Sequence, residues 1–462
     1  MSSAPMLLIT TLAEYQSVFW AAVGRELRAR GRAVAFVSFD DRSTEMLSAD
    51  GFEVFSLDER ERAILADEAS VRAAEAGYRM GNLNHWFAHE RFAFGVRDTQ
   101  ALQSKLLGCL SLARRACDSV QARDPRARMI QELGGFVSVV ASFFAARACG
   151  MPHWYVEPSF FRGRMFFLRD SFAALKLDPA LDGPVSPEVR DYLDRTLQTQ
   201  AIVIPKKDAH QYASAFRKIV NVRNAKRFVQ KVVDKHVHGK RQEFGHIGQY
   251  VSTHARMLLD SRRLSGAYTP LAGLGRFVYY PLHVPGDMAL TLRSPQFLDQ
   301  IAFVDYLART VPRTHCVAIK EHPAMVGAID ARRVLGLLAR YDTVALLPPT
   351  TNNYDVLRRA DAVITVNSKS GAEAALLGKR VLVMGDAFYR DSPLVEAVGS
   401  LDALESAVAR AVAGADAPAH GRDAIERYFE RVWRHTVPGE LYVPQLDNVR
   451  TFTESMLAAT GG

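Results

Sequence analysis

The sequence predicts an α/β protein with two open parallel sheets and a cleft between them. Short apolar runs rich in Val and Ile alternate with helical segments, and such runs are typical of strands buried on both faces of a parallel sheet. This alternation occurs at the start of the chain and again after residue 276, with a strand-free helical stretch in between. Each part is therefore expected to fold as a Rossmann-like domain. A chain of 462 residues is long enough for two domains, each with its own core.

The first domain begins with a regular alternation of strands and helices. Residues 5–10 are predicted to form a strand, and Thr11 is expected to cap a helix that runs to about Arg30. Further strands are predicted at residues 33–38 and 53–55, with a short helix between them. This βαβαβ order is typical of a doubly wound sheet.

Residues 58–127 are predicted to be mostly helical and to contain an aromatic cluster. A group of this kind usually packs in a core, and an acceptor-binding surface is the alternative interpretation. The cluster consists of His85, Trp86, Phe87, His89, Phe92 and Phe94. A strand near residues 129–131, a helix over 136–148 and a strand over 152–156 complete the domain.

Glu157 follows directly on the strand at residues 152–156, and Arg162 and Arg164 come shortly after it. A carboxylate in this place can form a strand-terminal ion pair, or it can face the cleft as a general acid or base. The two arginines are candidates for the substrate side of the cleft.

Residues 186–270 are predicted to form a basic helical connector, because hydrophobic residues recur at helical spacing among many basic ones. A solvated face is one interpretation. Peripheral contact with an anionic membrane is the other, since each basic residue near such a surface contributes about 1 kcal/mol. The basic residues are Lys206, Lys207, Arg217, Lys218, Arg223, Lys226, Arg227, Lys231, Lys235, Lys240 and Arg241. The net charge of +8 is spread over many arginines, which favours phosphate-bearing partners and does not indicate nucleic-acid binding.

The alternation of strands and helices resumes in a second domain, predicted at residues 271–415. Its strands are expected near Phe277, Val317, Val344, Val363 and Val381. The helical runs are expected to begin near Gln296, Ile329, Tyr354, Glu373 and Pro393. Residues 416–462 are predicted to be helical, with an amphipathic spacing at Ile425, Phe429 and Trp433, and to cross back to the first domain, residues 1–185.

Three polar segments in the second domain each follow a predicted strand at the point where the strand ends. They are the loop that holds His283 and Asp287, the run Lys320-Glu321-His322-Pro323, and the run Asn367-Ser368-Lys369-Ser370-Gly371. Ligands of open α/β sheets bind beyond the carboxyl ends of the strands. We therefore expect the three segments to meet in one site.

The segment at residues 367–371 precedes a predicted helix, and a helix N-terminus with its unpaired N–H groups binds phosphate readily. The alternative is that Ser368 and Ser370 simply cap the helix. Likewise, His322 either donates to a phosphate oxygen or is an exposed residue before a strand-ending proline. In the functional interpretation Lys320 adds positive charge, and Glu321 accepts from a ribose hydroxyl or a base amine.

Asp287 on its own would be an ordinary turn residue. Paired with Glu157 across the cleft, it would supply one of the two carboxylates that a double-displacement glycosyl transfer requires.

These segments resemble the motif blocks of a known family. Residues 280–283 (Tyr-Pro-Leu-His) with Asp287 and the later Asp299-Gln300 resemble the first block of capsule polysaccharide biosynthesis proteins. Residues 320–323 and 366–374 are similar to two further blocks of that family. The family contains the retaining β-Kdo transferases, which have two Rossmann-like domains in a GT-B arrangement and take Kdo from CMP-Kdo.

The resemblance implies a GT-B glycosyltransferase of capsule, O-antigen or lipopolysaccharide assembly that transfers Kdo from CMP-Kdo with retention. It implies that Asp287 is the nucleophile or cation stabiliser and that Glu157, in a segment similar to an acidic block of the family, is the acid/base. The nucleotide sugar would be bound by His283, Lys320, Glu321, His322, Pro323, Asn367, Ser368, Lys369, Ser370, Gly371 and Glu373. No metal or other cofactor is expected, because helix N-termini together with His or Lys can neutralise a leaving phosphate. A glycan or glycolipid would be the acceptor.

Other functions fit the same pattern. A glycerophosphotransferase acting on CDP-glycerol would share the sheet and the His-Pro segment but would not need Asp287. A transferase for another nucleotide sugar, an epimerase-like enzyme acting on a UDP-sugar, and a non-catalytic partner that only binds nucleotide or polysaccharide are the remaining alternatives.

The cysteines and the hydropathy of the sequence indicate the cellular compartment of the protein. Cys109, Cys117, Cys149 and Cys316 have no CxxC spacing and are expected to be buried, reduced thiols. No apolar stretch approaches about 18 residues, and no basic segment precedes Met6. A cytoplasmic protein is predicted, with peripheral contact at the inner face of the inner membrane as the alternative.

Overall fold

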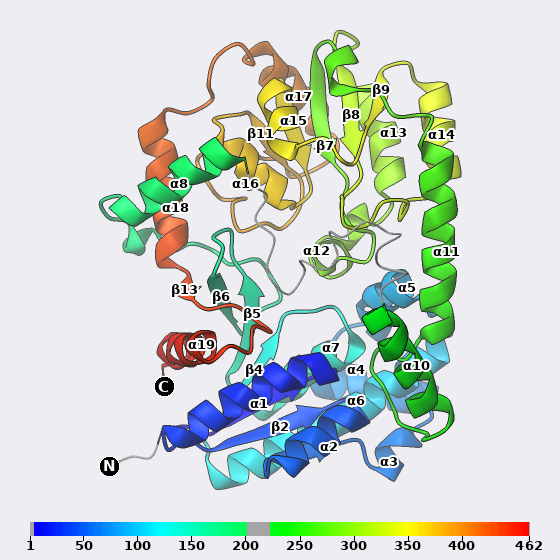
Figure 1. Ribbon diagram of the computed structural model, residues 1–462, viewed down its shortest axis with the longest axis vertical. Coiled ribbons are helices and arrows are strands. Elements are labelled where there is room, and N and C mark those ends of the chain that lie inside the picture. The colour runs from blue at the N-terminus through cyan, green and yellow to red at the C-terminus, as the bar shows by residue number, and fades with distance from the viewer. Residues whose placement is uncertain (1–3, 201–221, 462) are drawn as a thin grey trace.

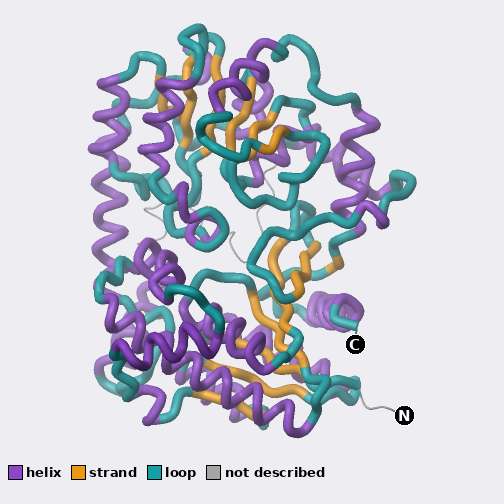
Figure 2. Tube along the Cα trace, turned by 180° about the vertical axis from the view of Figure 1, so that it is seen from behind, coloured by secondary structure: helices purple, strands orange, loops and turns teal. Residues whose placement is uncertain are grey.

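The computed structural model describes residues 4–200 and 222–461. It contains two α/β domains, each built on its own sheet, with the first domain below the second in Figure 1. Figure 2 shows the strands of the two sheets at opposite ends of the molecule from behind. The prediction of two Rossmann-like domains in a GT-B arrangement is confirmed.

The first sheet has the strand order β13-β6-β5-β4-β1-β2-β3. Its parallel strands are β1 (Leu7–Thr11), β2 (Val34–Ser38), β3 (Glu53–Ser56), β4 (Arg128–Glu132) and β5 (His153–Pro158). Two further strands extend it: β6 (Arg164–Arg169) pairs antiparallel with β5, and β13 (Val437–Pro438) pairs antiparallel with β6. The central strands β1 and β2 are buried along their whole length, which explains their unbroken apolar sequences.

Helices cover both faces of this sheet. On one face lie α1 (Glu14–Ala29) and the C-terminal α19 (Leu446–Ala459), where Phe19 and Trp20 pack edge-on against Phe452. The other face is covered by α6 (Thr99–Arg123) and α7 (Val137–Cys149). The last helix thus belongs spatially to the first domain, and both chain ends lie on the same side of it (Figure 1).

The second sheet is wholly parallel, with the order β12-β11-β10-β7-β8-β9. Its strands are β7 (Phe277–Pro281), β8 (Cys316–Lys320), β9 (Val344–Leu347), β10 (Ala362–Thr365), β11 (Val381–Val383) and β12 (Glu396–Ala397). The helices around it include α13 (Gln300–Thr310), α14 (Ala331–Arg340), α15 (Asn353–Arg359), α16 (Lys369–Leu376) and α17 (Leu404–Ala413). The strand order reverses between β7 and β10, and a crevice for ligands opens at such a switch point.

Helices connect the two domains on opposite sides. The long α11 (Ile247–Leu264) runs along one side from the first domain to the second, whereas α18 (Arg422–Arg434) leads back along the other beside α8 (Pro187–Thr199) (Figure 1). In the basic connector, Lys206, Lys207, Arg217 and Lys218 lie outside the described residues. After α10 (Val222–His236), Lys240 pairs with Glu45 of the first domain at 2.5 Å.

Two sequence-based predictions about elements are wrong. Thr11 does not cap α1, because it ends β1 and its hydroxyl bonds to Ser17, while Ala13 precedes the helix without side-chain capping. No helix begins at Pro393, where the chain turns and the Ser392 hydroxyl accepts from the N–H of Leu394.

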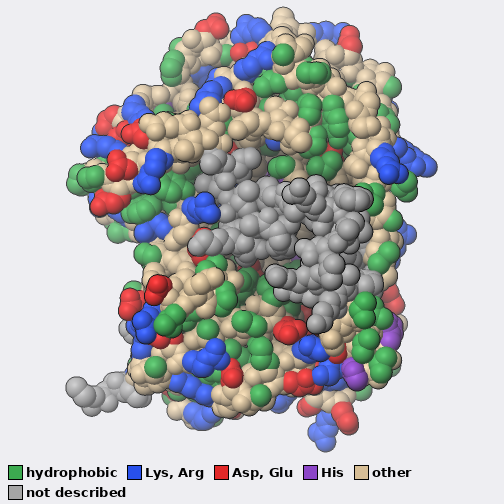
Figure 3. Space-filling view, in the orientation of Figure 1, with side chains coloured by type: hydrophobic (Ala, Val, Ile, Leu, Met, Phe, Trp, Pro, Cys, Tyr) green, Lys and Arg blue, Asp and Glu red, His purple; other side chains and the backbone are tan. Residues whose placement is uncertain are grey.

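The surface charge agrees with the sequence analysis, and the prediction of buried cysteines holds for two of the four. On the face shown in Figure 3, acidic and basic side chains are interspersed. All four cysteines are free thiols; Cys109 and Cys117 are buried, and Cys149 and Cys316 are half-buried. Within residues 4–200 and 222–461, no helix has both the length and the hydropathy of a membrane span.

Candidate active site

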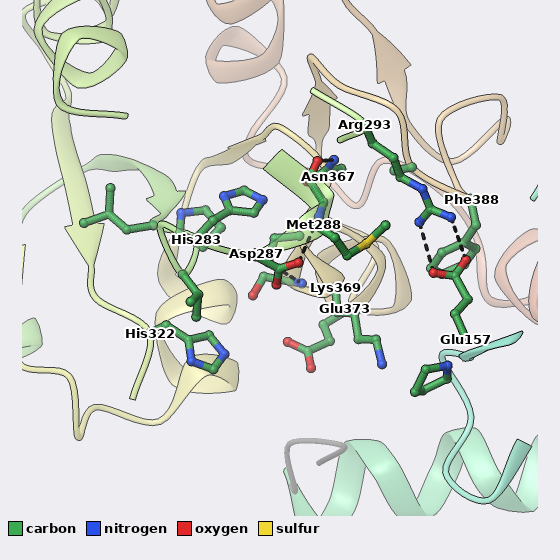
Figure 4. Close-up of a pocket in the computed structure, with 18 of the residues that line it drawn as sticks. Glu157, His283, Asp287, Met288, Arg293, His322, Asn367, Lys369, Glu373 and Phe388 are labelled. Atoms are coloured by element: carbon green, nitrogen blue, oxygen red, sulfur yellow. Dashed lines mark hydrogen bonds and ion pairs between the residues drawn. The ribbon is translucent and has the colours of Figure 1, made fainter. Parts of the chain in front are cut away.

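A cavity of about 470 Å³ lies between the two sheets, at the carboxyl ends of their strands. The first domain contributes the ends of β4 and β5, and the second contributes the loops after β7, β8 and β10. Most of the predicted site residues line it: Glu157, His283, Asp287, Lys320, Glu321, His322, Pro323, Asn367, Ser368, Lys369, Ser370 and Glu373. Figure 4 shows the cavity with His283, Asp287 and His322 on one side and Glu157 with Arg293 on the other.

Lys320 ends β8 and its side chain enters the cavity although the residue is only 4% exposed. None of the carboxylates that the structure describes lies within ion-pair distance of its ammonium group. Burial lowers the pKa of Lys320 to about 8, and the nearby charge of Glu373 partly offsets this effect. A buried cation without a counter-ion indicates a place for an anionic ligand.

The N-terminus of α16 lies beside Lys320. Ser368 caps the helix by accepting from the N–H of Ser370 at 3.2 Å, so the structural interpretation of this serine holds. Lys369 donates to the backbone oxygen of Ser159 in the first domain at 3.1 Å, which bridges the cavity walls. A polar cluster is thus arranged around the start of the helix.

Asn353, at the start of α15, organises the floor of the cavity. Its amide donates to Glu373 at 2.7 Å and to the Ser370 hydroxyl at 3.1 Å, and its oxygen accepts from the hydroxyl of Tyr279 at 3.0 Å. Burial raises the pKa of Glu373. The sequence analysis did not identify Asn353, because its role depends on partners in three other elements.

His283 is held by its backbone. The Gln300 side chain accepts from the His283 N–H at 2.6 Å and donates to its carbonyl at 3.0 Å. Burial lowers the pKa of His283 to about 4, so the ring is neutral at pH 7. The Asn367 side chain lies beside the ring and partly offsets the effect of burial on the pKa of His283.

Asp287 lies at the mouth of the cavity, where it caps the short helix α12 (Met288–Thr291) by accepting from the N–H of Ala289 at 2.9 Å. Asn367 ties this helix to the loop after β10, donating to the Ala289 carbonyl at 2.6 Å. The carboxylate of Asp287 is solvent-exposed and lies close enough to His322 for its charge to oppose the effect of burial, which lowers the pKa of that histidine.

His322 has a defined ring orientation. Its Nδ1 accepts from the backbone N–H of Ala324 at 3.3 Å, which assigns the proton of the neutral ring to Nε2. His322 can therefore act as a hydrogen-bond donor to a ligand oxygen without carrying charge.

Glu157 lines the cavity and forms an ion pair with Arg293, which the sequence did not indicate. The guanidinium group of Arg293 donates to both carboxylate oxygens of Glu157, at 2.9 and 3.1 Å, and to the carbonyl of Phe172 at 2.8 Å. The strand-terminal ion pair is therefore present, with Arg293 as the partner and not Arg162 or Arg164. This bridge joins the end of β5 to the segment after α12.

Three predicted site residues lie away from the cavity. Arg164 donates to the hydroxyl and the carbonyl of Thr436, both at 2.6 Å, and stacks on the Trp433 ring, so it anchors the C-terminal segment. The exposed Arg162 is not part of the cavity lining. Gly371 is buried at a close approach, where a Cβ atom would lie 2.4 Å from the Tyr389 hydroxyl oxygen.

Glu132 is a cavity-lining carboxylate that the sequence analysis missed. It ends β4 and accepts from the side chain of Gln16 at 3.1 Å and from the Tyr442 hydroxyl. The sequence does contain an indication of this role. Glu132 follows a predicted buried strand and precedes Gly134-Gly135, and Glu157 stands in the same position after the next strand.

Glu321 does not present its carboxylate to the cavity in the predicted way. One oxygen accepts from the N–H of Gly327 at 2.9 Å and the other from the Tyr268 hydroxyl at 3.4 Å, so the side chain shapes the loop after His322-Pro323. Burial raises the pKa of Glu321 to about 7.

The elevated pKa of Glu321 makes the stability of the protein depend on pH. Between the ordinary carboxyl pKa of 4.5 and about 7, the folded state keeps a proton that the unfolded state releases, so this group lowers the free energy of unfolding as pH rises. We expect Glu321→Gln to be more stable than the wild type at pH 8, by on the order of 1–3 kcal/mol, and equally stable near pH 5. Urea unfolding at the two pH values measures this difference, with the exposed Glu405→Gln as control. A stability difference that is the same at both pH values would contradict it.

Comparisons with known proteins place the chain in a family. The family described as "Capsule polysaccharide biosynthesis protein" matches residues 140–396, more than half of the chain. Protein FixF of Sinorhizobium fredii (strain NBRC 101917 / NGR234) is 32% identical over 153 residues, which are 33% of this chain and 37% of that protein. The chain thus matches well under half the length of this curated relative.

Two solved structures from Thermosulfurimonas dismutans are similar to the chain. The KpsC beta Kdo 2,4 transferase has 14% identity and a TM-score of 0.34, over 70% of this chain and 87% of that chain. The KpsC beta Kdo 2,7 transferase has 16% identity and a TM-score of 0.32, over 64% and 80%.

Proposed function

The chain belongs to the family of capsule polysaccharide biosynthesis proteins, and on that premise we propose that it is a metal-independent glycosyltransferase that transfers Kdo from CMP-Kdo with retention. The acceptor is a glycan or glycolipid of the bacterial cell surface. Catalysis takes place in the cavity between the two sheets, at the switch point of the second one.

The observation that carries the proposal is the buried, unpaired ammonium group of Lys320 at the end of β8. A nucleotide phosphate suits this place by its charge, since Lys369 and the N-terminus of α16 lie at the same cavity. The Nε2–H of His322 donates to a further phosphate oxygen. These groups stabilise the charge that builds up on the departing CMP.

Retention follows from two displacements at the anomeric carbon. In the first, a carboxylate oxygen of Asp287 bonds to that carbon as the bond to the CMP phosphate breaks. In the second, the acceptor hydroxyl attacks the same carbon, the bond to Asp287 breaks, and the hydroxyl proton passes to a carboxylate on the opposite wall. Glu157, the residue implied by the sequence, and Glu132 both lie on that wall.

The experiment that tests the donor is a thermal shift with CMP, CDP, UDP, GDP and ADP at matched concentrations. A ligand that binds only the folded state stabilises it by about 2.7 kcal/mol at one hundred times its Kd. We expect CMP and CDP to raise the melting temperature and the other nucleotides to leave it unchanged. A shift confined to UDP or GDP contradicts the CMP-Kdo donor, and no shift with any nucleotide contradicts the transferase.

A glycerophosphotransferase acting on CDP-glycerol would give the same cytidine-selective shift. Turnover distinguishes the two enzymes, since CMP is released from CMP-Kdo by the proposed transferase and from CDP-glycerol by the alternative. A non-catalytic nucleotide-binding partner would give the shift without releasing CMP from either donor.

A further inference from the structure

A second cavity, of about 930 Å³, lies on the other side of the loop that carries Asp287. Its walls come from the end of α5 (Ala88–Phe94) and the segment after it, from α11, and from the loops before α13 and α14. Pro285 lines this cavity, whereas Val284 and Asp287 line the first one. Because consecutive Cα atoms are about 3.8 Å apart, the Cα of Pro285 lies within about 7.6 Å of the Cα of Asp287. A molecule in the second cavity is therefore one loop away from the proposed reacting centre.

The loop between the two cavities is fastened to α5. A Cβ atom on Gly286 would lie only 3.1 Å from the Cα of Ala93, so the two backbones are in close contact. The ring of His89 bonds to the Thr291 hydroxyl at 2.9 Å and ties α5 to α12. In Figure 1, α5 lies next to α12 on the side where α11 passes. The position of the second cavity relative to Asp287 is thus fixed by packing.

The described lining of the second cavity has an excess of positive charge. Its arginines are Arg91, Arg97, Arg256 and Arg333, and its carboxylates are Asp299 and Asp330. Arg333 is balanced by Asp299, which its guanidinium group contacts at 2.8 and 2.9 Å. The other three arginines are exposed and have no ion-pair partner in the part of the chain that the structure describes; Arg91 donates to the Thr99 hydroxyl at 3.0 Å.

Helix α11 presents one polar face to this cavity, formed by Gln249, Thr253 and Arg256 at spacings of four and three residues. Opposite, on α5, the ring of Phe92 is 49% exposed at the cavity wall. Phe92 is the one member of the aromatic cluster in the described lining of this cavity; Phe87 and His89 are buried, Trp86 and Phe94 are half-buried, and His85 is exposed elsewhere. An exposed ring offers an apolar face for the C–H face of a sugar, and the surrounding amide, hydroxyl and guanidinium groups suit its hydroxyls and charges.

We propose that the second cavity binds the acceptor glycan and that this glycan is acidic. The guanidinium groups of Arg97 and Arg256 bind its carboxylate or phosphate groups in the forked geometry that both anions favour, and Phe92 stacks on a sugar ring. The assignment rests on the proposed glycosyltransferase function and specifies the charge of its acceptor. It also gives a role to Phe92, the member of the aromatic cluster that lies in the described lining of this cavity.

The test measures binding and not turnover. The full chain is titrated calorimetrically with oligogalacturonate, with oligosialate and with methyl-esterified oligogalacturonate, which has the same sugar without the charge. We expect the acidic oligomers to bind at least tenfold more tightly than the ester. We expect the double variant Arg97→Gln/Arg256→Gln to lose at least tenfold of that affinity, and Phe92→Ala to weaken the acidic oligomers and the ester alike. Arg262→Gln is the matched control, because Arg262 is exposed on the same helix but is not in the cavity lining.

Each outcome decides the question. Equal affinity for acidic and esterified oligomers, equal losses in the double variant and in Arg262→Gln, or no binding at all would overturn the proposal. A tripolyphosphate titration identifies the source of the charge: displacement of the oligosaccharide by micromolar tripolyphosphate assigns the cavity to phosphate groups of the acceptor, and no displacement assigns it to carboxylates. The nucleotide-induced thermal shift is measured on the same variants. Its absence in the wild type with intact oligosaccharide binding refutes the transferase and leaves the acidic-glycan site in place, and its persistence in the double variant shows that the first cavity is unchanged.

Discussion

Asp287→Asn is expected to lose transferase activity by on the order of 10³-fold or more while binding CMP as tightly as the wild type. An amide cannot form the glycosyl ester that the first displacement requires. The fold should survive, because asparagine is as good an N-cap as aspartate and the N–H of Ala289 keeps its acceptor. Initial rates of CMP release from CMP-Kdo with acceptor measure the loss, and the CMP-induced thermal shift measures donor binding.

Asp67→Asn is the matched control for this change. Asp67 caps α4 (Glu68–Tyr78) by accepting from the N–H of Ser70 at 2.8 Å, and it is not among the described lining residues of either cavity. Its activity should equal that of the wild type. If Asp287→Asn retained more than a tenth of the wild-type rate, Asp287 would not be the nucleophile and the double displacement would have to be abandoned.

Arg293→Met should cause a large loss of stability. The Arg293 side chain is 8% exposed and that of Glu157 is 17% exposed, so removing the guanidinium group leaves a largely desolvated carboxylate without a partner. Breaking such a pair costs about 3–5 kcal/mol. Urea unfolding followed by circular dichroism measures this free energy.

The double variant Glu157→Met/Arg293→Met distinguishes the free-energy cost of the unpaired Glu157 carboxylate from the cost of the other contacts that Arg293 loses. It should be more stable than Arg293→Met alone, because no unpaired carboxylate remains, although the carbonyl of Phe172 still loses its donor. Arg309→Met serves as the exposed control, since the pair of Arg309 with Asp305 is at the surface and is worth less than about 1 kcal/mol. A loss for Arg293→Met no greater than for Arg309→Met would mean that the bridge between β5 and the segment after α12 adds little to stability.

The candidate site could be predicted from the sequence because ligands of open α/β sheets bind beyond the carboxyl ends of the strands. His283, Lys320 and Asn367 each follow a run of buried apolar residues, and the carboxyl ends of parallel strands meet at one edge of a sheet. Local periodicity therefore sufficed to bring together residues far apart in the chain. The same pattern at the end of β4 points to Glu132, which also follows a buried strand.

The position of a residue at a strand end did not predict its role where that role depends on a partner from another element. The sequence shows Glu157 near Arg162 and Arg164, yet the ion pair forms with Arg293, and the two nearer arginines point elsewhere because β6 turns back along β5. Gly371 lies in a phosphate-binding pattern, but the approach of the Tyr389 hydroxyl is what excludes a side chain there. Neither contact follows from spacing along the chain.

The sequence by itself determined the class of the fold, the two-domain division and the three polar segments, since each depends on a periodicity of two to four residues or on the residue type at a strand end. Only the tertiary structure decided which carboxylates face the cavity, which cation is left without a counter-ion, and that a second cavity lined by arginines adjoins the first. The physical reason is that charge pairing and cavity shape depend on distances between side chains from different elements. Those distances are set by packing, which the order of residues does not display.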